Sequence, residues 1–436
     1  MQRFAPAQLL HSSAAVTSER YQLAVILFHA AVLVAAWHAA RPWWRDADRC
    51  RSAPRPWLFA LLHDGARLAF AAALAAVVAP ALLALPALER ISKSSATGRL
   101  LGEALFGEGV LFVTWLAHSH WRAQRPARGA VLGSVAVALL GAYWEGYHRE
   151  PRLLAVRHHV VDRAPAEGGS RELRILHLTD IQTPAIGEHE ARAFREGMAR
   201  SPDLIVMTGD YVQDELGRET EARAARDLRA LMARTGFAAP LGVFATEGDA
   251  GPSCLEVFGG TTVQCLVDAS VAVRLPDGGS ISITGLSGRR GRERSSAWLR
   301  GLLETAPPAR HRVVISHSPD FVDALTPSLV DLVLAGHTHG GQVVVPFFGP
   351  LYTASRLPRR YAGGLNDFRG IPLHVSRGVG MERGFAPQLR FVCPPEICVV
   401  DVRFGTRDGG RVASLATGAS GLPEPLDGPA LPASSR

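Results

Sequence analysis

Potential metal ligands recur through the second half of the chain, each just after a short apolar run. Three are carboxylates, three are histidines, and one is a glutamine that accompanies the first carboxylate. In chain order they are Asp180, Gln182, Asp210, Asp249, His317, His337 and His339. Oxygen donors combined with imidazole nitrogens suit Mn, Fe or Zn. The pattern predicts a site for divalent metal ions.

The sequence Gly336-His337-Thr338-His339-Gly340-Gly341-Gln342 is the strongest single motif. We expect these two histidines, two residues apart at a strand end, to serve two ions. The glycines let the backbone approach closely. Such a pair is a weak signal by itself, and it gains weight because four acid or histidine strand ends precede it.

Short runs rich in Leu, Val and Ile predict strands that end just before these residues. We expect strands at 173–179, 204–208, 243–247, 313–316 and 332–335, and further ones at 271–275, 281–286, 342–345, 373–376 and 397–403. Helices are expected at 188–201, 219–235 and 296–304. Strands that alternate with helices indicate a layered α/β fold, whose site lies at the carboxyl ends of its strands.

This series of motifs resembles the calcineurin-like metallophosphoesterases over roughly residues 173–403. It is closest to a bacterial, membrane-anchored branch that has the 336–342 motif and a Gly-Pro-Leu-Tyr-Thr-x-Ser-Arg segment, here at 349–356. The resemblance implies a four-layer α/β/β/α sandwich with two divalent ions. It also implies a hydrolase that cleaves a phosphomonoester or phosphodiester with metal-activated water.

The resemblance assigns roles to the ligands. Asp180 and His339 would bind the first ion, and Asp210 would bridge both. His317 and His337 would bind the second ion, together with an aspartate at the third motif.

Two motifs depart from the family pattern. The first usually reads D-x-H but here has Gln182, and the third usually reads G-N-H-[DE] but here has Asp249-Ala250. Gln182 still offers a carbonyl oxygen and Asp249 offers a charged one, so we expect Asp210 and Asp249 to act as catalytic residues. Ala250 cannot assist the leaving group as the family histidine does, and a lost proton donor typically costs about 10²–10⁴ in rate.

These departures leave alternative functions open. A catalytically impaired pseudoenzyme would act as a membrane-tethered binding or sensor module. A transporter would work through its membrane spans, where Glu108 is an intramembrane carboxylate. Ordinary polar strand ends without metal are a third alternative. The retained ligands favour the phosphoesterase, because drift would have spread losses across all the motifs.

Residues 1–150 have a different composition. Four apolar stretches, at 21–40, 68–88, 101–121 and 129–147, each approach the roughly 20 residues that a membrane-spanning helix needs. Aromatic residues lie at their ends, as in interfacial belts. The sequence therefore predicts an N-terminal α-helical transmembrane bundle in a multi-pass protein of the inner or cell membrane. Buried helices of a soluble domain are the alternative.

The remaining segments complete the predicted organisation. Residues 151–172 are expected to form a linker, 173–404 the metallophosphoesterase domain and 405–436 a disordered tail. Arginines at 41–55 and 122–128 favour cytoplasmic loops, which places the soluble domain outside the cytoplasm. A catalytic unit tethered to the membrane suggests a lipid-linked phosphoester as substrate.

Composition narrows the function further. The chain has 436 residues and a net charge of +7, and 47% of the residues are hydrophobic, so it is long enough for two or three units and is not largely disordered. The positive charge is almost all arginine and forms no run interleaved with aromatics, so no nucleic-acid partner is expected.

Five cysteines are too few for a disulfide scaffold. Pairing of Cys254 with Cys265, or of Cys393 with Cys398, is open.

Overall fold

The computed structural model describes residues 99–403, apart from positions 101 and 277 and the segments 163–171, 215–216, 289–290, 292–295 and 384–385. The chain divides into two compact units. The first comprises Met1–His148, Glu215–Gly217 and Glu382–Gln388. The second comprises Arg149–Asp214, Arg218–Met381 and Leu389–Arg436, and it carries all seven predicted ligands.

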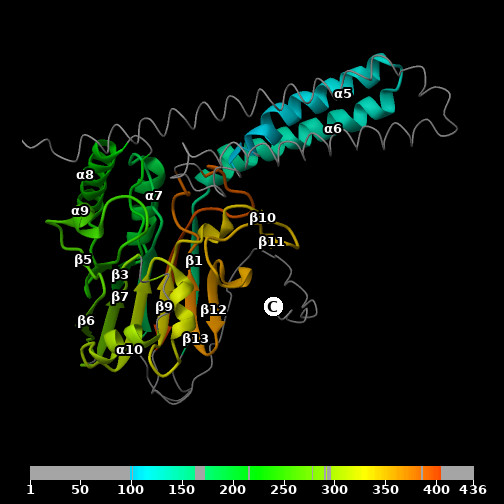
Figure 1. Ribbon diagram of the computed structural model, residues 1–436. Helices are drawn as coiled ribbons and strands as arrows, with labels where there is room; N and C mark the ends of the chain where they lie inside the picture. The colour runs from blue at the N-terminus through cyan, green and yellow to red at the C-terminus, as the bar shows by residue number, and fades with distance from the viewer. Residues whose placement is uncertain are drawn as a thin grey trace, which may run out of the picture. The chain divides into compact units, whose positions relative to one another are not determined.

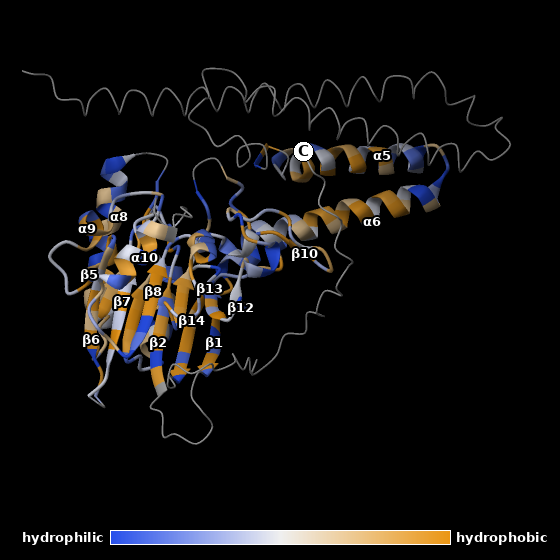
Figure 2. Cartoon of the chain, turned by 60° about the horizontal axis from the view of Figure 1, so that its bottom comes forward, coloured by the Kyte–Doolittle hydropathy of each residue, from blue (hydrophilic) through white to orange (hydrophobic). Residues whose placement is uncertain are grey.

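The first unit contains two packed helices, α5 (Val110–Arg122) and α6 (Pro126–Tyr143), preceded by a π-helical turn, η3 (Leu105–Gly109). Figure 2 shows α6 as largely hydrophobic. The helical stretch Pro126–Arg152 is the one helix in the described part of the chain that is long and apolar enough to cross a membrane. Its length and composition are those of a membrane anchor.

The four predicted spans fare differently. The span at 129–147 falls within this helical stretch. The span at 101–121 is helical over its described residues, and the π-helical turn η3 lies within it. The spans at 21–40 and 68–88, like the tail at 405–436, lie outside the described residues.

The second unit is built on two six-stranded sheets (Figure 1). In spatial order the strands of the first sheet are β1 (Ala155–Asp162), β14 (Glu396–Arg403), β2 (Glu172–Leu178), β3 (Leu204–Met207), β4 (Val243–Ala245) and β5 (Gln264–Cys265). Strands β2 to β5 are parallel to one another. β14 pairs antiparallel with β2, and β1 pairs parallel with β14.

The second sheet has a parallel centre flanked by antiparallel edge strands. Its strands are β12 (Gly364–Phe368), β13 (Ile371–Val375), β9 (Leu332–Ala335), β8 (His311–Ser316), β7 (Ser280–Gly285) and β6 (Ala269–Arg274). A small hairpin, β10 (Val344–Val345) and β11 (Gly349–Pro350), stands apart from both sheets.

Three apolar cores hold four layers together. One lies between the first sheet and helices α7 (Glu188–Met198), α8 (Arg218–Thr235) and α9 (Cys254–Phe258). A second lies between the two sheets. The third lies between the second sheet and α10 (Ser296–Glu304) with the 3₁₀ turn η7 (Pro319–Ala324). The observed order is the expected α/β/β/α sandwich.

One expectation needs correction, and one question left open by the sequence is answered. The segment 151–172 is not only a linker, because β1 pairs with β14 from Ala155 to Asp162. Arg157, His158 and His159 interrupt its apolar run, which hid this strand in the sequence. Among the cysteines, Cys254 and Cys265 form a disulfide between α9 and β5, whereas Cys393 and Cys398 are buried free thiols.

Candidate metal centre

The carboxyl ends of five strands meet at one place in the sandwich. Asp180, Asp210 and Asp249 follow β2, β3 and β4 of the first sheet, and His317 and His337 follow β8 and β9 of the second. Donor atoms of Asp249, His317 and His337 lie within 4.8 Å of one another, and so do those of Asp180, Asp210 and His317. The structure thus brings together ligands that are up to 157 residues apart in the sequence.

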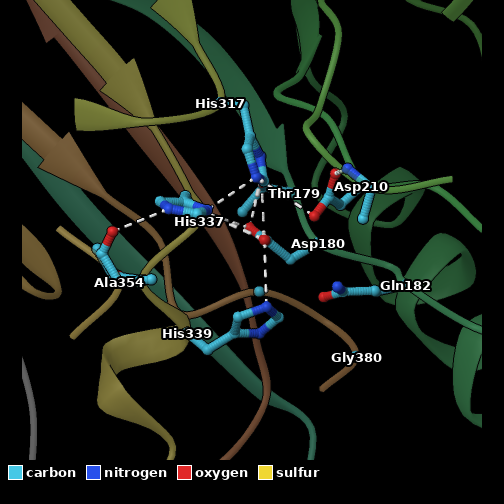
Figure 3. Close-up of polar contacts among 12 residues, drawn as sticks. Thr179, Asp180, Gln182, Asp210, His317, His337, His339, Ala354 and Gly380 are labelled. Atoms are coloured by element: carbon cyan, nitrogen blue, oxygen red, sulfur yellow. Dashed lines mark hydrogen bonds and ion pairs between the residues drawn. The ribbon is translucent and has the colours of Figure 1, made fainter. Parts of the chain in front are cut away.

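Two histidines turn one ring nitrogen each toward the other (Figure 3). Nδ1 of His317 lies 2.9 Å from the carbonyl oxygen of Thr208, and Nε2 of His337 lies 3.0 Å from that of Ala354. A carbonyl can only accept, so these contacts fix the proton on Nδ1 of His317 and on Nε2 of His337. The remaining nitrogens, Nε2 of His317 and Nδ1 of His337, are 3.1 Å apart.

Carboxylates surround this pair. Nε2 of His317 lies 3.2 Å from Oδ1 of Asp249 and 3.3 Å from Oδ2 of Asp210. Burial opposes a charge on His317, but Asp210 and Asp180 outweigh it and raise its pKa well above the usual value. A positive charge is thus favoured between these carboxylates, as a proton on His317 or as a cation in its place, and the carboxylate and imidazole donors fit a divalent ion.

Asp180 lies at the centre of the second group of donors. Its carboxylate is buried and accepts hydrogen bonds from the Thr179 hydroxyl, at 2.7 Å, and from the backbone N–H of His337, at 3.0 Å. Nε2 of His339 is 3.4 Å from its Oδ1. Burial raises the pKa of Asp180 to about 6, and the neighbouring Asp210 carboxylate adds to this. A buried carboxylate in this state gains from a nearby cation.

Asp210 stands between the two groups. Its Oδ1 accepts hydrogen bonds from the backbone N–H groups of Asp249 and Ala250, both at 3.0 Å, which leaves Oδ2 facing His317. This close approach requires Gly248, because a Cβ at that position would collide with the Asp210 carboxylate. The third motif therefore holds Asp210 through its backbone.

The backbone at the site is held in a conformation that side chains disfavour. Asp180, Gln182, Asp210, His337 and His339 all have positive φ, between 42° and 70°. Each such residue costs of order 1 kcal/mol, and this strain characteristically gathers at functional sites. The two histidines also lie beyond β9 rather than on it, and His339 begins a 3₁₀ turn, η8 (His339–Gly341). Residues two apart on a strand would face the same way, so it is this turn that gives the two histidines different directions.

The atypical positions have distinct surroundings. Gln182 is buried, and its Nε2 donates to Oε1 of Gln213 at 2.8 Å, which orients the amide toward Asp180 and His339 (Figure 3). Ala250 contributes only its backbone N–H. The sequence analysis missed the carbonyl acceptors Thr208 and Ala354. Ala354 belongs to the 349–356 segment, and that motif was the available signal for it.

Comparison with known proteins agrees with this geometry. The family model of calcineurin-like phosphoesterases matches residues 173–341, which hold all the predicted ligands. Residues 173–341 therefore form a calcineurin-like phosphoesterase domain. As a calcineurin-like phosphoesterase it is a hydrolase that acts on phosphoester bonds.

Its similarity to individual family members varies in extent. An uncharacterized metallophosphoesterase, YkuE of Bacillus subtilis, is 27% identical over 63% of this chain and 95% of its own length. UDP-2,3-diacylglucosamine pyrophosphatase LpxG of Chlamydia muridarum is 25% identical over 61% of this chain and 94% of its own length. Phosphodiesterase YaeI of Escherichia coli is 37% identical, over 22% of this chain and 35% of its own length.

Proposed function

We propose that this protein is a membrane-anchored phosphoesterase that uses two divalent ions, Mn, Fe or Zn, to hydrolyse a phosphomonoester or phosphodiester. The observation that carries the proposal is the pair of facing nitrogens on His317 and His337, 3.1 Å apart among carboxylates. Both rings are oriented by backbone carbonyls, as metal-binding histidines usually are.

The donors divide into two sets. Asp180 and His339, with the amide oxygen of Gln182, would hold one ion, and His317, His337 and Asp249 would hold the other. The Asp210 carboxylate, which lies 3.3 Å from His317 and is fixed by two backbone N–H groups, would contact both.

Bound divalent ions would supply activation of water and neutralisation of charge on the phosphate. The protein contributes orientation. The hydrogen bonds at Thr208, Ala354 and the Asp249–Ala250 backbone fix the ligands before substrate arrives, so little reorganisation accompanies the reaction. With alanine at 250, the leaving group departs without a proton from that position. Leaving groups that are stable anions, such as a phosphate, suit this site best.

An apolar surface beside the site supports a lipid-linked substrate. Phe347 is 90% exposed, and Phe348, Leu351 and Tyr352 are also largely exposed. These residues lie in or next to the β10–β11 hairpin, and the same segment continues to Ala354, whose carbonyl orients His337. The relative LpxG is named for a diacylglucosamine substrate. Exposed aromatics of this kind suit the boundary between water and lipid.

Two features support the proposed location. The helical stretch Pro126–Arg152 supports a membrane anchor. The disulfide between Cys254 and Cys265 supports an extracytoplasmic position for the domain, because disulfides persist in oxidising compartments.

Full-length protein in detergent, loaded with Mn²⁺, would test the activity on bis-p-nitrophenyl phosphate. Asp210→Asn should reduce turnover about a hundredfold or more, because it removes a carboxylate shared by both ions. Asp227→Asn changes an exposed aspartate on α8 and should leave turnover unchanged. Equal, near-background rates in wild type and Asp210→Asn would instead favour the impaired binding module, to which the missing acid at Ala250 points.

A further inference from the structure

A second group of metal-ligating side chains lies away from this centre. His159 on β1, His374 on β13 and Cys398 on β14 each place one donor atom within 4.8 Å of the others. β1 and β14 belong to the first sheet, and β13 belongs to the second. We propose that these three side chains bind a structural ion of the zinc class, which joins the two sheets and is separate from the phosphoesterase centre.

Strand register places all three side chains in the layer between the sheets. Val400 belongs to the inter-sheet core, and its register partner on β1 is His159. Cys398 lies two residues before Val400 and therefore faces the same way. On β13, Leu373 packs in the outer core, so the next residue, His374, points inward to meet them.

Two ring nitrogens in this group have no partner. Nε2 of His159 and Nε2 of His374 are both buried, and neither atom makes a hydrogen bond. The His374 side chain is 0% exposed. Buried polar groups are rarely left unpaired, because the interior does not replace the water that they lose. A metal ion between these nitrogens would satisfy both.

The opposite side of His374 is already held as a metal-binding histidine requires. Its Nδ1 lies 3.0 Å from Nδ1 of His177, and Nε2 of His177 lies 2.9 Å from the Thr208 hydroxyl. When Nδ1 of His374 donates to His177, the lone pair of His374 is on Nε2, within the group. Metal-bound histidines usually have their second nitrogen hydrogen-bonded in this way.

The donor types select the ion. A thiolate with two imidazoles suits zinc, whereas the oxygen-rich phosphoesterase centre also suits manganese. Oε1 of Glu396 lies 3.5 Å from Sγ of Cys398 and is the candidate fourth donor of a tetrahedral site. Zinc bonds of about 2.0–2.3 Å would draw the donors together by roughly an ångström.

Cobalt is a selective probe, because the phosphoesterase centre has no cysteine ligand. Full-length protein stripped with a chelator would be titrated with Co²⁺ while the thiolate-to-cobalt charge-transfer absorption is followed. We expect an absorption that saturates at about one ion per chain. It should persist in Asp210→Asn, which alters the other centre, and in Cys393→Ser, the matched variant of the other buried free thiol. It should be lost in Cys398→Ser.

Absence of this absorption from the wild-type protein would overturn the proposal without reference to any variant. An absorption that survives Cys398→Ser, or that disappears in Cys393→Ser, would overturn it as well. Elemental analysis of zinc-loaded protein gives a second readout. His374→Gln should hold about one ion fewer than wild type while its turnover of bis-p-nitrophenyl phosphate still depends on Asp210. Equal zinc content in the two proteins would contradict the site.

Discussion

His317 and His337 each use one ring nitrogen to contact a backbone carbonyl, at 2.9 Å from Thr208 and 3.0 Å from Ala354. These contacts fix which nitrogen faces the carboxylates. Position 250 lacks any comparable group, since Ala250 offers only its N–H, to Asp210. Residue by residue, the site is therefore well equipped to hold cations and poorly equipped to protonate a leaving group.

Restoring a histidine at position 250 should reveal this imbalance. Ala250→His is expected to speed hydrolysis of an alkyl phosphodiester, a substrate with a poor leaving group, by about tenfold or more. The rate on bis-p-nitrophenyl phosphate should change little, because nitrophenolate leaves without a proton. Ala238→His, at an exposed position on the surface, serves as the control. If Ala250→His and wild type hydrolyse each substrate at the same rate, another group already acts as the acid.

His177 gives a prediction on pH. It is fully buried, and burial, with a smaller effect from His159, lowers its pKa to about 3. In the unfolded chain the same ring has a pKa near 6.5. As the pH falls below 6.5, the unfolded state therefore binds a proton that the native state does not bind. Stability conferred by this group is present above pH 6.5 and is lost progressively toward pH 3, by about 1.4 kcal/mol per pH unit.

Denaturant unfolding of metal-free protein between pH 4.5 and 6.5 would measure this effect. His177→Asn should show a slope of unfolding free energy against pH that is shallower by about one proton. An exposed histidine gives no such term. An unchanged slope would mean that His177 becomes protonated in the folded protein.

At the scale of elements, the parallel strands direct their carboxyl ends to one place, and the β10–β11 hairpin stands beside it. The strands position the candidate ligands at their carboxyl ends. The hairpin presents apolar side chains to solvent, with Phe347 90% and Phe348 60% exposed. Arg359 lies over the Phe348 ring, 4.8 Å from its centroid. The hairpin therefore has a surface suited to lipid and no part in binding the ions.

Changing the hairpin should separate lipid substrates from soluble ones. We expect Phe347→Asn combined with Phe348→Ser to lower turnover of a phosphoester presented in mixed micelles by about tenfold or more, since each aromatic buried in lipid contributes roughly 1.5–3 kcal/mol. Turnover of bis-p-nitrophenyl phosphate should be unchanged. Leu255→Ser, at an exposed leucine on α9, is the control. An equal loss on both substrates would assign the hairpin a structural role.

For the molecule as a whole, the Cys254–Cys265 disulfide bears on which side of the membrane the phosphoesterase domain occupies. This bond closes a loop of 11 residues between α9 and β5. Such a bond forms where the compartment is oxidising, outside the cytoplasm. If the domain lies outside the cytoplasm as proposed, Cys254 and Cys265 must therefore be oxidised in cells.

Cells that express the full chain offer a direct measurement. After acid quenching, Cys254 and Cys265 should resist alkylation until a reductant is added, whereas Cys393 and Cys398 should react once the protein is denatured. Reduction should also lower the free energy of unfolding by about 3 kcal/mol. Alkylation of Cys254 without reductant would place the domain in the cytoplasm.

The amino-acid sequence by itself determined the layered fold and the candidate ligands. Alternation of apolar runs and helices is a local property, and acids or histidines placed at strand ends, such as Asp180 and His317, are visible without coordinates. The π-helical turn before α5 and the strand β1 were not visible. No residue pattern marks a π-turn within a helix, and β1 carries Arg157 and two histidines.

Only the tertiary structure decided which nitrogen of each histidine faces the ligands, since that depends on carbonyls of distant residues, Thr208 and Ala354. It also decided which cysteines pair, because a disulfide depends on spatial separation. The gathering of His159, His374 and Cys398 from three strands has the same origin. Sheet register brings them together, and no spacing along the chain records it.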